Sequence, residues 1–555
     1  MRWAAVLMAA GSLLFAAPAV AQSSASTAAD PNALSTPPTQ DKPPPGHALS
    51  AVQAIAIAGR VPKISAEERA NPGSHAEASL KGTSRWQVSY FAKPSKDGVR
   101  GKEIAQVLID DRSGKVLEAW TGFQVAWSMA RGYPGAFGRK VNALYVWLPM
   151  CLLFLAPFIS IRRPWRMVHL DLLVLVAGFS VSLAFFNAGK IGASVPLIYP
   201  VLIYLMARMI WLARRRESDR DNGSFPLNVP ISWLFVGLVF LVGFRVGLNL
   251  TNSNVIDVGY SGVIGADRLI DGSSLYGNFP ADNAHGDTYG PVAYYAYVPL
   301  EQAFPWSGKW DDLPAAHGAA VAFDLLAIAG LWLLGLRLRG PRLGAVLAYA
   351  WAACPITLLV ANSNANDSLV AVFLIGALLL AARPVGRGAM VALAGMTKFA
   401  PLGLGPLFAS HRRNPQEPLR ITDFASYAVA FAVVVAVTML PVILGDDGLS
   451  TFYDSTLRFQ DDRGSPFSIW GIVGGLDGFQ TAAKVAAGLF AIAAALIPRR
   501  RDVVGLAAMA AAVLIALQLG ITHWFYLYAA WFLPFIFVVL FGRWSEGERD
   551  PVATP

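Results

Sequence analysis

The sequence predicts a mainly α-helical, polytopic membrane protein with a small α+β domain near its N-terminus. Of its 555 residues, 55% are hydrophobic and only 15% are charged, and the mean hydropathy is +0.47. Soluble domains carry about 25% charged residues, so this composition excludes a soluble enzyme, a disordered protein and a fibrous repeat. Many apolar stretches reach roughly 20 residues, the length that crosses a bilayer. Arginines cluster beside these stretches, which explains the net charge of +9 without nucleic acid as a partner.

The first residues predict a secretory signal peptide over residues 1–21. Arg2 precedes an apolar run from Ala4 to Phe15, and Ala19-Val20-Ala21 forms a small-residue cleavage site. An uncleaved first membrane helix is the alternative. Residues 22–48 are rich in Pro, Ser and Ala, which predicts an extended linker.

Residues 49–125 are polar enough to fold as an extracytoplasmic α+β domain. Helical character at 49–58 and 66–70 precedes three predicted strands, at 86–91, 105–110 and 116–120. A turn joins the last two strands, with Gly114 suited to a positive φ. The run Ile-Asp-Asp-Arg-Ser-Gly-Lys-Val-Leu-Glu at 109–118 resembles the repeat of PepSY-type domains. That resemblance implies a binding or regulatory module, and a structural cap is the alternative.

Thirteen membrane crossings are expected. Three additional helices over 142–213 precede a transmembrane core over 228–541, and a tail at 542–555 follows. Between 388 and 411, Lys398 and two prolines break an apolar stretch, which predicts two short helices that rise to the outer side and return. The other eleven spans are expected near 142–161, 169–187, 193–212, 230–250, 316–336, 343–361, 367–382, 424–444, 480–497, 503–521 and 524–541.

The positive charges orient these spans. Cytoplasmic loops carry an excess of Lys and Arg, and here alternate loops hold arginine clusters such as 162–166, 214–216, 337–342 and 499–501. We therefore expect a protein of the bacterial inner membrane, with its N-terminal domain outside and its C-terminus in the cytoplasm. The pattern Asp219-Arg220-Asp221 resembles a nucleotide-sugar metal motif, but it falls in an inner loop and is interpreted as solvated charge.

The candidate chemistry lies in three expected outer segments, 251–313, 362–367 and 445–471. Ionisable residues at membrane level are costly and are functional candidates by default. Lys398 and His523 are expected at the same level. Arg245 lies within a span, and we expect its side chain to snorkel to the outer face.

The order of motifs resembles the GT-C glycosyltransferases, especially glycosyltransferase family 87, over roughly 230–541. The resemblance rests on Asp257 after a span, followed by Gly-Ser-Ser-Leu-Tyr at 272–276, Thr-Tyr-Gly-Pro at 288–291, Asn366-Asp367, Lys-Phe-Ala-Pro at 398–401 and the run 463–471. It implies a membrane-embedded enzyme that transfers a sugar from a polyprenyl phosphate to an extracytoplasmic glycan or lipid. In this sequence the acidic loop follows three additional spans, so the N-terminal part looks appended.

The resemblance also implies roles for individual residues. Asp257 is the expected general base, and cationic or donor groups would hold the phosphate. Other polar and aromatic residues of the outer loops would contact sugar or acceptor. The expected phosphate-binding residues are Lys398, Arg458, Arg463 and His523. The expected sugar- or acceptor-binding residues are Tyr260, Asp287, Tyr289, Asn366, Asp367 and Trp470. Mannose and arabinose are both compatible donors, and a divalent metal is compatible with the residues but has no assigned ligands.

Simpler roles stay open for several of these residues. Asp257, Asn366 and Asp367 could cap the helices that follow them, and Arg458 and Arg463 could be ordinary loop charges. For the whole chain, a transporter or flippase for a lipid-linked sugar is one alternative function. A non-catalytic assembly or sensor protein is another, and it predicts no substrate-sized cavity around Asp257.

Overall fold

The computed structural model describes residues 34–94, 101–132, 137–160, 164–215, 227–412, 418–445, 448–496 and 502–542. The expected signal peptide, the Asp219-Arg220-Asp221 pattern, the 499–501 arginine cluster and residues 543–555 lie outside these ranges. The chain forms two compact units that divide after Ser128, and each is described by itself.

The N-terminal unit is a five-stranded antiparallel meander in the order β1-β2-β3-β4-β5. Apolar side chains on one face of the sheet, including Trp86, Val88 and Val107, pack with Ala54 and Ala58 of a helix. Ser50 and Gln53 form a reciprocal capping box at the start of that helix. The elements are β1 (Leu34–Ser35), α2 (Ala51–Gly59), α3 (Pro62–Ala70), β2 (His75–Lys81), β3 (Arg85–Phe91), β4 (Glu103–Asp110), β5 (Val116–Thr121) and α4 (Phe123–Ala126).

This unit differs from the sequence prediction at two places. The described part of the predicted linker, residues 34–48, belongs to the unit, because Leu34–Ser35 pairs with β2 and the backbone N–H groups of Ala48 and Leu49 donate to the buried carboxylate of Asp111. Strand β2 was not predicted. Its Ala and Glu residues favour helices, and pairing along the whole of β3 overrides that preference. Gly114 has the expected positive φ, at 65°.

The second unit is helical. Its α-helices are α5 (Leu144–Leu155), α6 (Met167–Leu173), α7 (Phe179–Asn187), α8 (Ile191–Arg214), α9 (Ile231–Asn252), α10 (Asp257–Asp271), α11 (Val292–Tyr295), α12 (Val298–Ala303), α13 (Pro314–Arg339), α14 (Pro341–Ala353), α15 (Pro355–Asn362), α16 (Asp367–Leu379), α17 (Pro384–Thr397), α18 (Gly405–Ala409), α19 (Ile421–Thr438), α20 (Leu440–Leu444), α21 (Gly448–Tyr453), α22 (Phe459–Asp462), α23 (Ile469–Ile472), α24 (Asp477–Ala493), α25 (Val503–Gly520) and α26 (Ala529–Gly542). Short 3₁₀ or π turns extend several of them, among them η3 (Val174–Gly178), η6 (Ala400–Leu404), η7 (Asp454–Arg458) and η8 (Tyr526–Tyr528).

Six helical segments in the described ranges are long and apolar enough to cross a membrane, so the chain is a membrane protein. They are Met167–Asn187, Ile191–Arg214, Ile231–Asn252, Pro314–Arg339, Ile421–Thr438 and Val503–Gly520. Helices α14 and α15, with a 59° bend between them, form a seventh candidate span if the pair is counted as one. The expected thirteen crossings are not confirmed, because other predicted spans are short helices: α5 has 12 residues and α16 has 13.

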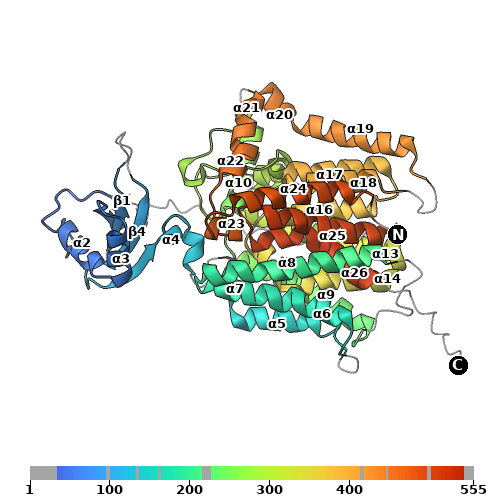
Figure 1. Cartoon of the computed structure of the whole chain (residues 1–555), viewed down its shortest axis with the longest axis horizontal. Coiled ribbons are helices and arrows are strands. Elements are labelled where there is room, and N and C mark those ends of the chain that lie inside the picture. Colours follow the sequence, from blue (N-terminus) through green and yellow to red (C-terminus); the bar gives the residue numbers. More distant parts are fainter. Residues whose placement is uncertain are drawn as a thin grey trace. The chain divides into compact units, whose positions relative to one another are not determined.

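The centre of this unit is formed by α25 and α26. Helix α26 is buried along its whole length and packs against α25, α16 and α14. Helices α8 and α25 lie side by side (Figure 1). By contrast, the apolar windows of α9 and α19 are only 17% and 11% buried within the unit. A helix that is apolar all round is buried in protein or faces lipid, so the exposed apolar faces of α9 and α19 are suited to contact lipid.

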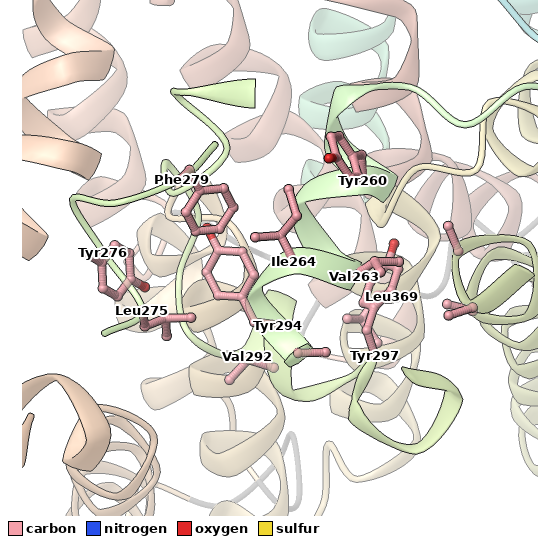
Figure 2. Close-up of a cluster of buried hydrophobic side chains, with 14 of the residues drawn as sticks. Tyr260, Val263, Ile264, Leu275, Tyr276, Phe279, Val292, Tyr294, Tyr297 and Leu369 are labelled. Carbon is pink, nitrogen blue, oxygen red and sulfur yellow. The ribbon is translucent and has the colours of Figure 1, made fainter. Parts of the chain in front are cut away.

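Helix α10 is anchored in a cluster of tyrosines (Figure 2). The ring of Tyr297 packs on Gly262, and that of Tyr294 packs on Gly265 one turn later; a Cβ at either glycine would lie about 2.5 Å or less from the ring atoms. These glycines therefore let the rings reach the helix backbone. The packing fixes the helix that begins with Asp257.

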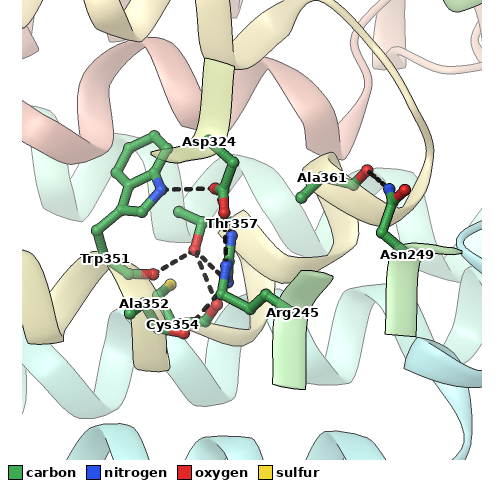
Figure 3. Close-up of polar contacts among 8 residues, drawn as sticks. All are labelled: Arg245, Asn249, Asp324, Trp351, Ala352, Cys354, Thr357 and Ala361. Atoms are coloured by element: carbon green, nitrogen blue, oxygen red, sulfur yellow. Dashed lines mark hydrogen bonds and ion pairs between the residues drawn. The ribbon is translucent and has the colours of Figure 1, made fainter. Parts of the chain in front are cut away.

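A buried ion pair connects α9 with α13 and α14 (Figure 3). Arg245 donates two hydrogen bonds to Asp324 of α13, at 2.7 and 2.5 Å, and a third to the carbonyl of Ala352 near the end of α14. The indole of Trp351 donates to the same carboxylate at 2.8 Å. The expectation that Arg245 snorkels outward is wrong, because a carboxylate on a neighbouring helix holds it inside the bundle.

Candidate functional site

The polar residues of interest gather at one end of the helices. Helices α9, α17 and α25 end there, and α13, α16 and α26 begin there. Many arginines mark the opposite ends of these helices, with Arg337 and Arg339 at the end of α13 and Arg383 and Arg387 at the start of α17. The sequence-predicted residues therefore come together from distant parts of the chain.

A cavity of about 450 Å³ opens at this end, a volume typical of ligand sites. Its polar side includes Thr288, Tyr289, Lys398, Gln518 and His523. Its other side is mainly apolar and runs between η6, η7, α24 and α25, through Phe399, Ala400, Gly403, Leu457, Ala487, Leu517 and Ile521. The cavity can therefore take a molecule with a polar head and an apolar tail.

Lys398 lies on the cavity wall where the chain breaks between α17 and η6. Its Nζ atom is 2.8 Å from Oδ1 of Asp367, the first residue of α16. Three aromatic rings surround the ammonium, with centroids 5.1 Å (Tyr289), 5.4 Å (Tyr528) and 5.6 Å (Trp531) away. Cation–π contacts of this kind stabilise a desolvated cation. Lys398 is thus held in one place, and its charge is partly balanced by Asp367.

The loop beside Lys398 requires a glycine. Gly290 follows Tyr289 and lies so close to α17 that a Cβ there would be 2.0 Å from the carbonyl oxygen of Met396. Its N–H donates to the carbonyl of Thr397. This close backbone contact brings the Tyr289 ring over Lys398.

Asp257 is the first residue of α10, and its side chain is exposed to solvent. The N-cap position of this helix is Ile256, so Asp257 is not the N-cap residue. Burial among surrounding protein atoms raises the pKa of Asp257; Arg463 and Lys398 oppose this rise, and Asp367 adds to it. A side chain that is exposed to solvent but surrounded by many protein atoms lies in a recess of the surface, and this is the position of Asp257. Asp257 is not among the cavity-lining residues, but its charge also raises the pKa of Tyr289, which is one of them.

His523 lies between α25 and η8, and its Nδ1 is 2.9 Å from Oγ of Ser465. Burial lowers the pKa of His523 well below 6.5, and the positive charges of Arg463 and Lys398 lower it further. The ring is therefore neutral near pH 7. It can serve as a hydrogen-bond donor or acceptor but not as a cation.

Arg458 and Arg463 differ although they are close in sequence. Arg458 is 64% exposed and pairs with Asp454 and Asp462 at 3.1 and 3.6 Å. Arg463 is half-buried, lies over the ring of Phe459, and acts electrostatically on both Asp257 and His523. Of the two, only Arg463 shares the electrostatic neighbourhood of Asp257.

Several other predicted residues have structural contacts instead. Tyr260 is fully buried, stacks on Trp310 and donates to Asp282. Asp287 accepts a hydrogen bond from the backbone of Gly277 at 2.7 Å. Trp470 donates to the carbonyl of Leu519 at 2.9 Å. These contacts hold the loops around the cavity.

Asn366 precedes α16 and is completely buried, and its carboxamide makes no side-chain cap. Neither polar atom of that carboxamide has a hydrogen-bond partner, and Oδ2 of Asp367 has none either. Buried polar atoms are normally paired with protein or water. The start of α16 therefore retains unused hydrogen-bonding capacity beside Lys398.

Sequence reasoning missed other residues of the cavity. Asp461 and Lys484 form an exposed ion pair of 2.8 Å on its wall. Gln518 is buried and donates to the carbonyl of Tyr528, another wall residue. Asp461, Lys484 and Gln518 are polar residues in or beside apolar helices, and this pattern could have identified them in the sequence. Within the described ranges, no three His, Cys, Asp or Glu side chains group in a way that could hold a metal ion.

The chain is similar to a known family of enzymes. Residues 288–520 match the sequence model of glycosyltransferase family 87, which covers fewer than half of the 555 residues. No curated protein matches the chain. Tyr289, Asp367, Lys398 and Arg463 lie inside the matched segment, whereas Asp257 and His523 lie outside it. Together with the apolar helices, this similarity supports a membrane-embedded glycosyltransferase.

Proposed function

We propose that this protein transfers a sugar from a polyprenyl-phosphate donor to an extracytoplasmic glycan or lipid acceptor, with Asp257 as general base. The observation that carries the proposal is the setting of Asp257: a solvent-accessible carboxylate at the start of α10, within the electrostatic reach of Arg463 and Lys398. A base must meet its acceptor in an open recess, and a raised pKa makes a carboxylate a stronger base.

The reaction is a displacement at the anomeric carbon. The acceptor hydroxyl oxygen forms a bond to that carbon while Asp257 takes the hydroxyl proton. The bond between the anomeric carbon and the phosphate oxygen breaks, and the electron pair leaves with the polyprenyl phosphate. Configuration inverts at the anomeric carbon.

The shape of the cavity supports a lipid-linked donor. Its apolar side between α24, α25 and η6 suits an isoprenoid chain, and its polar side carries Lys398 and His523. Lys398 and Arg463 supply positive charge for the leaving phosphate. Neutral His523 supplies a hydrogen bond. Tyr289 is available to stack on a sugar face, and the unpaired polar atoms of Asn366 and Asp367 suit water or hydroxyl groups.

The proposed function includes the orientation of the protein in the membrane. The arginine-rich helix ends lie opposite the cavity, and positive charge favours the cytoplasmic side. The cavity then faces the outside of a bacterial inner membrane, where lipid-linked sugars rather than nucleotide sugars are the available donors.

The test is sugar transfer by purified protein in nanodiscs, with radiolabelled mannosyl and arabinosyl polyprenyl phosphates. Asp257→Asn keeps the shape and removes the base, so we expect a loss of 10²–10⁴-fold in kcat with donor binding retained. Asp267→Asn, on the same helix, is the matched control and should transfer sugar normally. Transfer by Asp257→Asn at the normal rate would assign the base to another acid.

A transporter or flippase is the second candidate, and buried ion pairs in the bundle favour it. Arg208 pairs with Asp171 at 2.8 Å, and Arg245 pairs with Asp324. Charges inside membrane bundles often mark transport pathways. Proteoliposomes that hold the lipid-linked sugar in one leaflet separate the two functions, since only a flippase exchanges it between leaflets without consuming it.

A further inference from the structure

The chain segments that precede Asp257 and Asp367 lie directly against each other. The N–H of Ile256 donates to the carbonyl of Ser363 at 3.3 Å, and the N–H of Asn254 donates to that of Asn362 at 3.4 Å. A Cβ at Gly259 would lie 2.2 Å from the carbonyl oxygen of Asn364. No side chain separates the two backbones here, so a shift of one segment must move the other.

Three buried asparagines, Asn249, Asn362 and Asn364, join these segments, and we call them the asparagine clasp. Asn364 donates to Oγ of Ser253 and to the carbonyl of Asn254, each at 2.9 Å, and accepts from Asn249 at 2.8 Å. Asn249 also donates to the carbonyl of Ala361, as Figure 3 shows. Asn362 donates to the carbonyl of Asn252 at 2.8 Å. All three side chains are at most 1% exposed.

The clasp also reaches α13. Nδ1 of His317 lies 3.1 Å from both Oδ1 of Asn249 and Oγ of Ser253. The backbone explains why Asn stands at position 364, since its φ is +51°. Asn tolerates this left-handed conformation better than most residues, and its carboxamide supplies both donors and an acceptor to the clasp.

We propose that the asparagine clasp positions Asp257 relative to Asp367 and Lys398. On one side the clasp binds the carbonyl of Asn254, three residues before Asp257, and on the other Asn364 lies three residues before Asp367. None of the three asparagines is among the described residues that line the cavity, so they act as positioning residues. The inference rests on the proposed role of Asp257 as base. It assigns to Asn362 and Asn364 a function different from that of their neighbours Asn366 and Asp367.

The distance between the base and the acceptor determines the rate of transfer. A misplacement of about 1 Å can lower the rate on the order of 100-fold, because the base must stay within hydrogen-bond reach of the acceptor hydroxyl. Loss of the clasp frees the residues before Asp257 while the tyrosine cluster still holds the rest of α10. We therefore expect an effect on the chemical step and little effect on donor binding.

The test uses Asn364→Gly in the full-length protein, because glycine keeps the positive φ and removes the carboxamide. We expect kcat to fall on the order of 100-fold and the KM for a polyprenyl-phosphate sugar to stay near its normal value. Asn187→Ala is the control, since it removes another interhelical asparagine bond, to Asn142. If Asn364→Gly does not accumulate, Ser253→Ala removes one acceptor of Asn364 and should lower kcat by a smaller factor.

A double variant separates positioning from general stability. In Asp257→Asn protein the base is absent, so adding Asn364→Gly should cause no further loss of the residual rate. A merely structural role would lower that rate again and overturn the inference. Normal kcat in Asn364→Gly, with Asp257→Asn inactive, would also overturn it and leave the proposed function intact. An active Asp257→Asn would remove the proposed function itself.

Discussion

Two buried ion pairs of the helical unit look alike and differ in what surrounds them. Asp324 accepts hydrogen bonds from Nε and Nη2 of Arg245 and from the indole of Trp351, and both of its oxygens are bonded. Asp367 receives Lys398 and the indole of Trp531 on Oδ1 alone, while Oδ2 has no partner. The first pair lies within the bundle and the second adjoins a cavity. A closed pair of this kind holds helices together, whereas an incompletely satisfied pair beside a cavity can serve a ligand.

The largest expected effect is on folding at the closed pair. Arg245→Met leaves the carboxylate of Asp324 buried without its cation, and breaking such a pair costs about 3–5 kcal/mol. We expect a marked fall in thermal unfolding temperature and in the yield of folded protein in detergent. The double variant Arg245→Met/Asp324→Leu should recover part of this loss, because no uncompensated charge remains. Unfolding at the normal temperature in the single variant would contradict a structural role.

At the cavity the same kind of substitution should reduce function more than stability. Asp367 loses one hydrogen bond in Lys398→Met, whereas Asp324 loses two in Arg245→Met, so we expect a smaller fall in unfolding temperature than in Arg245→Met. A charged hydrogen bond to phosphate is worth about 1.5–3 kcal/mol, which corresponds to a rise in donor KM of roughly 10–100-fold. Steady-state kinetics with a polyprenyl-phosphate sugar measures this. An unchanged KM would limit Lys398 to its contacts with Asp367 and the three rings.

A pH–rate profile distinguishes the role of Arg463 from that of Arg458. Asp257 must be ionised to act as base, so activity is lost as pH falls through its pKa, which burial raises. Arg463 opposes that rise, so Arg463→Gln should raise the pKa of Asp257 further and move the acid limb of the pH–rate profile to higher pH. Arg458 pairs with Asp454 and Asp462 on the surface, and Arg458→Gln should leave the limb in place. Equal shifts in both variants would contradict this assignment.

The sequence predicted the regular features well and the pairings between distant segments poorly. Alternating residues located β3, β4 and β5 within two residues at each end, and apolar length located α8 and α9 within two residues and α13 within three. These signals are local. The partner of Arg245 could not be read from the sequence, since Asp324 lies 79 residues away and only helix packing brings them together.

At the candidate site, too, local signals predicted positions along the chain but not which side chains face the cavity. Charge pattern and span ends predicted that Asp257, Lys398 and His523 would line one cavity. Lys398 and His523 do line the cavity, whereas Asp257 is not among its lining residues and is linked to it by its electrostatic interaction with Lys398. Whether a side chain faces the cavity depends on packing. Tyr260 enters the tyrosine cluster, and Arg458 turns to acids of its own helical segment. Their residue types are the same as those of Tyr289 and Arg463, so composition alone could not separate them.

The smallest expected effect concerns the N-terminal unit. The described cavity-lining residues run from Thr288 to Trp531, and the unit has its own sheet, helices and core. Deletion of 34–128 should therefore leave kcat and KM unchanged in protein that still enters the membrane. The deletion must include β1, because a cut at residue 49 would leave Leu34–Ser35 without its partner strand. Transfer rates of the deletion and the full chain, each normalised to the inserted protein, measure this. Complete loss of transfer in a correctly inserted deletion would mean that the N-terminal unit takes part in acceptor binding, and the contrast between a catalytic unit and an appended one would fail.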